Sequence, residues 1–287
     1  MGLVVVPPLR AEDSSTNIAA DVVAEFKRGH VYIQARLKGV EKPVSMMLDT
    51  GFTVNTLRPE LAEEAGLKRT GATRIMGIAG QEEAPIYGEA AFTFGSLRYD
   101  PRRTAALPSD RGSRREDGIL GASFFRRFVV EIDAKKVTLH EPAAFNYSGN
   151  GEIIPFKIRQ QTPVLEATLA LPHREPVRGQ FELDMGCTGG LCLAHDFVEA
   201  NHLLEAAGET SGTQRRGIGG GAGIREGHLP ELLIGKSRVL KPSTSFFTSG
   251  SPAEKGMAGH IGWAALREFK VIFDYSRQCL ILEPLSR

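Results

Sequence analysis

Two acidic residues stand out because each follows a short apolar run and precedes a glycine by two positions. Asp49 lies in Leu48-Asp49-Thr50-Gly51, and Asp184 lies in Leu183-Asp184-Met185-Gly186, 135 residues further along the chain. The glycine lets the backbone turn tightly beside the carboxylate. Two carboxyl groups a few ångströms apart cannot easily both ionise, so they share a proton and can act together as general base and general acid on a water. Asp49 and Asp184 are therefore the candidate catalytic pair.

Further segments recur around the two acids in the same order. Glu60-Leu61-Ala62-Glu63 returns as Asp196-Phe197-Val198-Glu199, Gly77-Ile78-Ala79-Gly80 returns as Gly217-Ile218-Gly219-Gly220, and residues 118–133 return as residues 259–274. The offset between the copies grows only from 135 to 141 residues, which a few inserted loop residues reconcile. Because four anchors keep their order and spacing, the sequence predicts one domain present twice.

The segments that must position the acids have strand patterns. Residues 30–37 have apolar side chains at every second position, and residues 44–48 form a short apolar run that leads into Asp49. Residues 162–171 and 180–183 take these parts before Asp184. Ile119-Leu120-Gly121 supplies an apolar pair and a glycine where a further strand can cross under the turn of the first acid.

Short helices and hairpins complete each predicted copy. Residues 59–67 predict a helix, with Pro59 at an early helical position and Gly66 near its end. Residues 128–133 with 137–139, and residues 269–274 with 279–282, predict two hairpins. The recurring Asp133 and Asp274 stand before their turns, so they are interpreted as turn residues.

With these motifs the chain resembles the pepsin and retroviral-type aspartic peptidases. It is most similar to the bacterial retropepsin-like proteins that carry two tandem lobes in one chain, over about residues 27–287. The resemblance rests on these segments: Leu48-Asp49-Thr50-Gly51; Gly118-Ile119-Leu120-Gly121 with Phe125, Phe128 and Asp133; residues 183–188; and Gly259-His260-Ile261-Gly262 with Leu266, Phe269 and Asp274. It implies an all-β fold of two pseudo-twofold-related closed β lobes, with a short helix in each.

The resemblance also implies a domain division and a set of site residues. The expected domains are an N-terminal extension (1–26), a first lobe (27–142), a linker (143–152) and a second lobe (153–287). The acids are expected to be supported by residues of their own loops: Thr50, Gly51, Thr53, Met185, Gly186 and Thr188. Flaps that close over bound peptide are expected at Gly77, Ile78, Gly80, Gly217, Ile218 and Gly220.

The implied activity is that of an aspartic endopeptidase in which Asp49 and Asp184 activate a water, with no metal or cofactor. Its partner would be a peptide or protein substrate, and two acids in one chain predict a monomer. Met185 stands where the family favours threonine, and Phe52 and Cys187 stand where small or hydroxyl residues are usual. The alternative is therefore a catalytically weak or inactive peptide-binding module of the same fold.

Composition and local motifs argue against a nucleic-acid-binding, membrane-spanning or nucleotide-binding protein. A net charge of +1 gives no indication of a nucleic-acid partner. No apolar run approaches the roughly 20 residues that cross a bilayer. The arginines at 102, 103, 111, 114 and 115 are interspersed with acids and are interpreted as a solvated loop. Residues 217–221 lack the Lys-Ser/Thr of a nucleotide-binding loop.

The three cysteines and the histidines leave two questions open. Cys187 and Cys192 either pair across a short loop or, as the favoured interpretation, are small buried residues like Cys279. The compartment therefore stays undecided between periplasmic or secreted and cytoplasmic. His195 and His202 have no third ligand at a zinc-like spacing and are interpreted as surface residues, while Trp263 is expected in the core.

Overall fold

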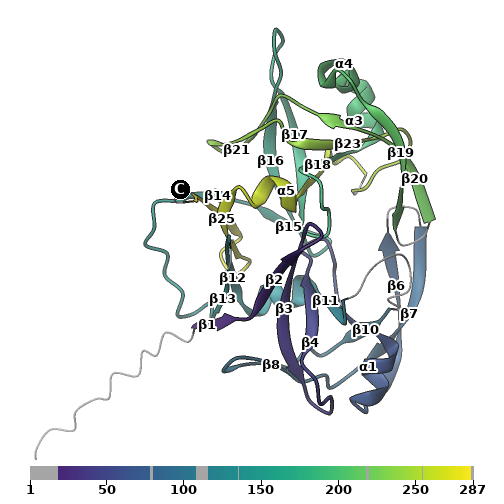
Figure 1. Ribbon diagram of the computed structural model, residues 1–287, viewed down its shortest axis with the longest axis vertical. Helices are drawn as coiled ribbons and strands as arrows, with labels where there is room; N and C mark the ends of the chain where they lie inside the picture. The colour runs from purple at the N-terminus through teal and green to yellow at the C-terminus, as the bar shows by residue number, and fades with distance from the viewer. Residues whose placement is uncertain are drawn as a thin grey trace, which may run out of the picture.

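The computed structural model describes residues 19–77, 80–107, 116–134, 136–217, 220–253 and 255–285. Its strands form two ten-stranded sheets and one six-stranded sheet, with short helices between them. In Figure 1 the two large sheets lie one above the other, and the six-stranded sheet lies beside their junction. The predicted all-β fold of two β lobes with short helices is confirmed.

The first ten-stranded sheet carries Asp49. Its strands in spatial order are β6 (Arg69–Gly77), β7 (Gly80–Tyr87), β10 (Thr104–Ala106), β5 (Asn55–Leu57), β11 (Gly118–Leu120), β4 (Val44–Leu48), β3 (His30–Leu37), β8 (Phe92–Phe94) and β9 (Leu97–Tyr99), with β2 (Ala24–Lys27) paired to β3. Helix α1 (Pro59–Glu64) follows β5, and helix α2 (Ala122–Arg127) follows β11.

The second ten-stranded sheet carries Asp184. Its strands in spatial order are β19 (Ser211–Gly217), β20 (Gly220–His228), β23 (Ser243–Phe247), β18 (Leu191–Leu193), β24 (Gly259–Gly262), β17 (Val177–Asp184), β16 (Thr162–Ala170), β21 (Glu231–Ile234) and β22 (Ser237–Leu240), with β15 (Lys157–Arg159) paired to β16. Helices α3 (His195–Ala200), α4 (Leu203–Ala207) and α5 (Trp263–Leu266) connect its strands. The order of the strands matches that of the first sheet position by position.

The predicted elements agree with these bounds, with small differences at their ends. The strands at 30–37 and 44–48 have the predicted limits. Helix α1 begins at Pro59 and ends at Glu64 rather than at Leu67, because Gly66 takes the left-handed conformation (φ 65°) that ends helices. Strand β17 begins at Val177, before the predicted Gln180, since it continues to pair with β16.

The six-stranded sheet joins the two halves of the chain. Its order is β1 (Ala19–Val22), β13 (Lys136–His140), β12 (Val129–Asp133), β25 (Phe269–Asp274), β26 (Cys279–Pro284) and β14 (Glu152–Pro155). Both predicted hairpins are part of it, and they meet where β12 pairs antiparallel with β25. Strands β1 and β2 include residues assigned to the N-terminal extension, and the predicted domain boundaries stay a prediction.

One hydrophobic core runs through both halves. Phe125 of α2 packs against Phe273 of β25, with ring centroids 5.5 Å apart, and against Tyr275 at 5.6 Å. Aromatic pairs at these separations add to the stabilisation from buried area. Trp263 is buried, as predicted. The two acid-bearing sheets are thus held on a shared apolar base.

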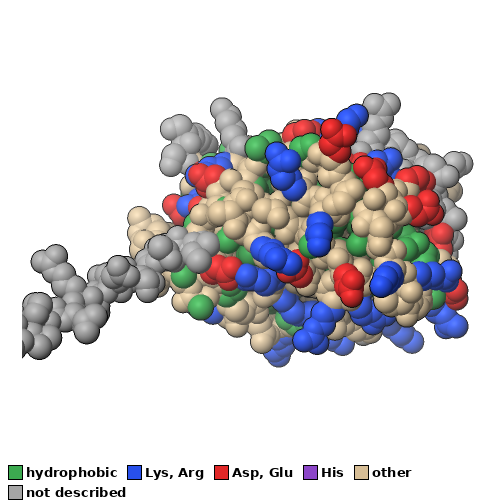
Figure 2. Space-filling model, turned by 90° about the horizontal axis from the view of Figure 1, so that it is seen from below, with side chains coloured by type: hydrophobic (Ala, Val, Ile, Leu, Met, Phe, Trp, Pro, Cys, Tyr) green, Lys and Arg blue, Asp and Glu red, His purple; other side chains and the backbone are tan. Residues whose placement is uncertain are grey.

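On the face drawn in Figure 2, Asp and Glu side chains lie among Lys and Arg over the upper and middle parts, and Lys and Arg predominate along the lower edge. Arg102 and Arg103 are exposed, as expected for a solvated loop, whereas residues 111, 114 and 115 lie outside the described residues. Among the residues that the structure describes, no helix is long and apolar enough to span a membrane.

Candidate active site

Each acid lies at the end of a strand that pairs in parallel with a later strand of its sheet. Leu48, just before Asp49, is opposite Leu120 of β11, and Asp184 is opposite Gly262 of β24. The backbone N–H of Asp49 donates to the carbonyl oxygen of Leu120 at 3.1 Å. The later strand therefore fixes where the acid leaves the sheet.

Glycines let those later strands pass beneath the acid-bearing turns. A Cβ on Gly121 would lie 2.5 Å from the carbonyl oxygen of Phe52, and a Cβ on Gly262 would lie 2.5 Å from that of Cys187. Real Cβ atoms do not approach oxygen so closely, so neither position accepts a side chain without a shift of the backbone. The crossing strand expected at residues 119–121 is present in this form.

The structure brings the two acids face to face. Gly51 donates its N–H to Oδ1 of Asp49 at 2.9 Å, and Gly186 donates to Oδ1 of Asp184 at 2.8 Å. A Cβ on Gly51 would lie 2.5 Å from Oδ1 of Asp184, and a Cβ on Gly186 would overlap the carboxyl group of Asp49. The carboxyl group of Asp49 lies close enough to that of Asp184 to lower the pKa of Asp184 through a hydrogen bond. Each loop thus packs directly against the acid of the other.

Thr50 joins the two loops from one side. Its buried hydroxyl donates to the carbonyl oxygen of Leu183 at 2.7 Å and accepts from the N–H of Met185 at 3.0 Å. Met185, at the corresponding position of the second loop, has no hydroxyl and cannot make the reciprocal hydrogen bonds to the first loop. Its side chain lies in the core. Thr53 is exposed, and Thr188 lies half-buried against Gly29 of the first half.

Two ionisable residues that sequence reasoning missed lie beside Asp184. Nδ1 of His260 is 2.7 Å from Oδ2 of Asp184, and its Nε2 is 3.0 Å from Oε2 of Glu182, close but poorly aligned for a hydrogen bond. The repeat held the signal. It aligns His260 with Ile119 and Glu182 with Met47, so two ionisable residues stand where the first copy has apolar ones.

These contacts set the charges at the site. Burial lowers the pKa of His260, but the negative charge of Asp184, the hydrogen bond with Asp184 and the nearby carboxylate of Glu182 outweigh it and raise the pKa to about 10. Burial raises the pKa of Asp184, but the charge of His260, together with hydrogen bonds from His260, Asp49 and Gly186, brings it below its ordinary value. At neutral pH the site therefore holds an imidazolium beside a carboxylate.

A disulfide joins Cys187 and Cys192, which corrects the favoured interpretation that all three cysteines are unpaired. The sequence separation of five residues allowed the pair, but only the fold shows that β18 runs back beside the loop of Asp184. The bond fastens that loop to β18. Cys279 is free and half-buried.

A hairpin stands at each predicted flap position. Strands β6 and β7 pair up to Gly77 opposite Gly80, and strands β19 and β20 pair up to Gly217 opposite Gly220. In Figure 1 both hairpins lie on the same side of the molecule, with their turn ends pointing towards each other. Ile78 and Ile218 lie outside the described residues.

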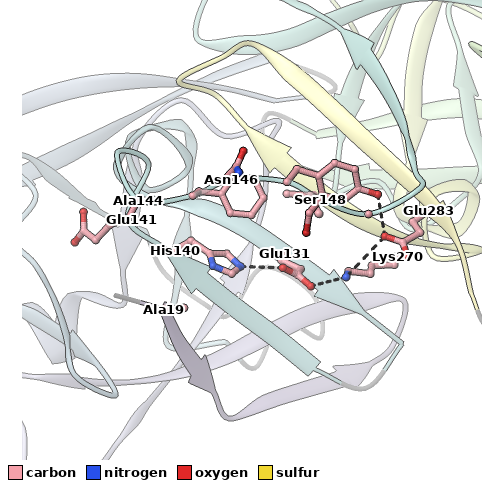
Figure 3. Close-up of a pocket in the computed structure, with 13 residues that line it drawn as sticks. Ala19, Glu131, His140, Glu141, Ala144, Asn146, Ser148, Lys270 and Glu283 are labelled. Atoms are coloured by element: carbon pink, nitrogen blue, oxygen red, sulfur yellow. Dashed lines mark hydrogen bonds and ion pairs between the residues drawn. The ribbon is translucent and has the colours of Figure 1, made fainter. Parts of the chain in front are cut away.

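A second charged cluster lies in the six-stranded sheet, under residues 144–149 (Figure 3). Glu131 is 2.8 Å from Nε2 of His140 and 2.8 Å from Nζ of Lys270, and Lys270 is 3.8 Å from Glu283. The hydrogen bond with His140, opposed by burial and supported by Lys270, lowers the pKa of Glu131 to about 2. Its charges are paired with each other in a pocket of about 380 Å³, and no residue of either acid loop lines it.

Comparisons with known proteins concern the first half of the chain and the overall fold. Residues 33–124 match the family model described as aspartyl protease. The crystal structure of the aspartic proteinase from Irpex lacteus superposes with a TM-score of 0.59 at 14% identity, over 93% of this chain and 98% of that one. At that identity the likeness concerns the fold alone. No curated protein sequence matches the chain.

Proposed function

We propose that the chain is an aspartic endopeptidase, in keeping with the aspartyl protease family model that residues 33–124 match, and that its catalytic residues are Asp49 and Asp184. The single observation that carries the proposal is the approach of the two acid loops, in which each glycine lies against the carboxyl group of the other loop. Such a pair can hold one proton and one water between its two carboxyl groups.

Hydrolysis would proceed by proton transfers within this pair. The ionised carboxylate removes a proton from the water as its oxygen bonds to the carbonyl carbon of the peptide, and the protonated carboxyl gives its proton to the carbonyl oxygen. When the resulting gem-diol collapses, one of its two hydroxyl groups becomes the new carbonyl and gives its proton to the pair of acids. The leaving nitrogen takes up a proton from the pair as the C–N bond breaks. Protons and charge balance without a covalent intermediate.

The substrate would be an extended peptide lying between the acid pair and the hairpins β6–β7 and β19–β20. Closure of such hairpins would exclude water from the reacting groups. Because both acids come from one chain, we propose that the monomer is the active form. Asp184 keeps 15% of its side chain exposed, whereas Asp49 is buried.

The proposal is tested by incubating the full chain with an unfolded protein and a peptide library from about pH 3 to pH 7. Asp49→Asn and Asp184→Asn should each lower kcat/KM by about 1000-fold or more, as removal of one member of a catalytic unit does. Asp133→Asn, at an exposed hairpin turn, is the matched control and should cleave like the parent. Equal cleavage by all three variants would contradict the assignment.

A peptide-binding module without turnover is the second candidate. Its supporting observations are Met185, which has no hydroxyl on the second acid loop, and Phe52 and Cys187, which stand where small or hydroxyl residues are usual in the family. Peptide binding without cleavage over long incubation at every pH tested would favour this candidate over the enzyme.

A further inference from the structure

We propose that His260, held by Glu182, is a positioning residue that keeps Asp184 ionised and thereby places the proton shared by the pair on Asp49. The inference rests on the proposed function for its chemical meaning, since it assigns the two roles within that pair: Asp184 as general base and Asp49 as general acid. Its observational basis is the arrangement of three side chains on one face of the second sheet.

The strand register places these side chains together. His260 of β24 is directly opposite Glu182 of β17, and Asp184 follows Glu182 by two residues. Because side chains two apart along a strand point to the same face, Glu182, Asp184 and His260 share that face. The imidazole is thus held between two carboxylates, at 2.7 Å on Nδ1 and 3.0 Å on Nε2.

A carboxylate oxygen close to each ring nitrogen favours a proton on each. A neutral imidazole carries only one N–H, so one of its nitrogens would present a lone pair to a carboxylate oxygen. The imidazolium has two N–H groups and a positive charge, and both suit this position. The position of the ring between two carboxylates therefore favours the charged form of His260 on geometric grounds.

The charged form leaves Asp184 as an acceptor at both oxygens. Oδ1 accepts from the N–H of Gly186 at 2.8 Å, and Oδ2 lies 2.7 Å from Nδ1 of His260. Because Oδ2 faces a cation, a proton is less favoured on Asp184 than on a carboxyl group without such a neighbour. In the hydrogen bond between the two acids, Asp49 is therefore the favoured donor.

The charged groups that act on His260 lie on the neighbouring strand β17. Asp184 and Glu182 on β17 carry the charges that act on it, and Asp49 faces it across Asp184. The neighbouring strand β18 places Cys192 opposite, and this cysteine is held in the disulfide with Cys187. Glu182 balances the imidazolium, so the pair of acids retains the single negative charge that the reaction needs.

The roles follow with their protons accounted for. Asp184 takes the proton of the attacking water, and Asp49 gives its proton to the carbonyl oxygen as the new C–O bond forms. After this step the proton resides on Asp184, beside the imidazolium, where it is least favoured. Its transfer to the leaving nitrogen is therefore assisted by His260.

The first test is spectroscopic and does not require activity. In the full chain, imidazole ¹⁵N shifts, assigned by loss of one signal in His260→Gln, should show His260 charged at pH 7. Side-chain carboxyl ¹³C shifts, assigned with Asp49→Asn and Asp184→Asn, should show Asp184 ionised at pH values where Asp49 is protonated. Asp184→Asn should weaken proton binding by His260 at least about tenfold, since one carboxylate is lost. A neutral His260 at pH 7, or protonation of Asp184 before Asp49, would overturn the inference.

The second test uses the pH profile of kcat/KM. His260→Ile leaves Glu182 unbalanced beside the acids, so both limbs should move to higher pH by about one unit or more. The double variant Glu182→Met with His260→Ile copies the apolar pair Met47 and Ile119 of the first half, and its limbs should lie between those of the parent and the single variant. A merely structural role would lower kcat/KM without this order of shifts.

The two proposals fail in different ways. Cleavage with unmoved pH limbs and a neutral His260 would overturn the role of His260 and leave the peptidase intact. A charged His260 and an ionised Asp184 in a protein that cleaves no peptide would support the charge arrangement and contradict the peptidase. Should the single variant fail to fold, the double variant and the spectra of the parent still decide.

Discussion

The strand that delivers Asp49 and the strand that delivers Asp184 have corresponding pairing partners but opposite chemistry two residues before the acid. Beside Asp49, Met47 and Ile119 form a buried apolar cluster with Tyr32. Beside Asp184, the same positions in the register are held by Glu182 and His260. One acid is therefore flanked by hydrocarbon and the other by charge.

This difference teaches which positions the fold restricts. The glycines at 51, 121, 186 and 262 leave no room for a side chain, because backbone or carboxyl oxygens occupy the space. By contrast, positions 47 and 119 hold a buried apolar pair, whereas the corresponding positions 182 and 260 hold a carboxylate and an imidazole in contact. The fold can therefore keep the same backbone geometry around both acids while ionisable neighbours in the second half alone determine how charge is distributed between them.

The largest effect is expected where the two halves are alike. Gly51→Ala and Gly186→Ala should each reduce kcat/KM by about 100-fold or more, because the added methyl group displaces the opposite carboxyl group. Each should also lower the free energy of unfolding by about 2–3 kcal/mol. Urea denaturation and peptide cleavage measure both effects. Gly71→Ala and Gly212→Ala are matched controls, since a Cβ at either position meets no atom within 4 Å. If the control variants lost as much, the close-approach argument would be wrong.

A smaller effect tests the one-sided tie between the loops. Thr50→Val removes the hydroxyl that donates to the carbonyl oxygen of Leu183 and accepts from the N–H of Met185. Both backbone groups then lose a hydrogen-bond partner. The free energy of unfolding should fall by about 2 kcal/mol. Met185→Leu keeps the core volume and the backbone N–H, so its change should stay within about 1 kcal/mol. Thermal and urea unfolding compare the two. An equal fall in the free energy of unfolding for the two variants would mean that the hydrogen bonds of the Thr50 hydroxyl do not stabilise the contact between the loops.

The charged side of the comparison predicts how stability changes with pH. The folded-state pKa of His260, about 10, lies above the ordinary 6.5, so its stabilisation is complete below about pH 6.5 and is lost as pH rises through 10. The expected loss is about 2 kcal/mol, measured as the free energy of unfolding in urea from pH 6 to pH 10. The double variant Glu182→Met with His260→Ile should lack this slope. A parent protein equally stable at both ends would contradict the charged imidazole.

The smallest effect comes from the charged cluster of the six-stranded sheet. The pKa of Glu131 is lowered to about 2, so its stabilisation is present above pH 4.5 and disappears as pH falls through 2. At neutral pH, Glu131→Gln should cost about 1 kcal/mol, because the cluster is partly exposed. It should leave the pH limbs of kcat/KM unmoved, which separates this cluster from His260. A shift of those limbs would show that remote charges control the pKa values of Asp49 and Asp184, which would contradict the assignment of that control to His260.

Much of this arrangement could be predicted from sequence, because it depends on local patterns. Alternation at residues 30–37, the apolar run into Asp49 and Pro59 at the start of α1 each report a local preference. The role of His260 could not be predicted, because its meaning depends on the register of β24 against β17, which brings residues about 78 apart into contact. The disulfide was missed for a similar reason, since the path of β18 decides it.

In the six-stranded sheet, the pairing of β12 with β25 joins the two halves of the chain. The three strands on the β12 side, β1, β13 and β12, precede Pro142 in the sequence. The three strands on the β25 side, β25, β26 and β14, follow Pro142, and β12–β25 is the pairing in this sheet that links the two groups. Two fragments separated within residues 142–151 would each keep three of these strands and expose one matching edge. Co-expressed, they should recombine by complementation and rebuild the acid pair without a peptide bond between them.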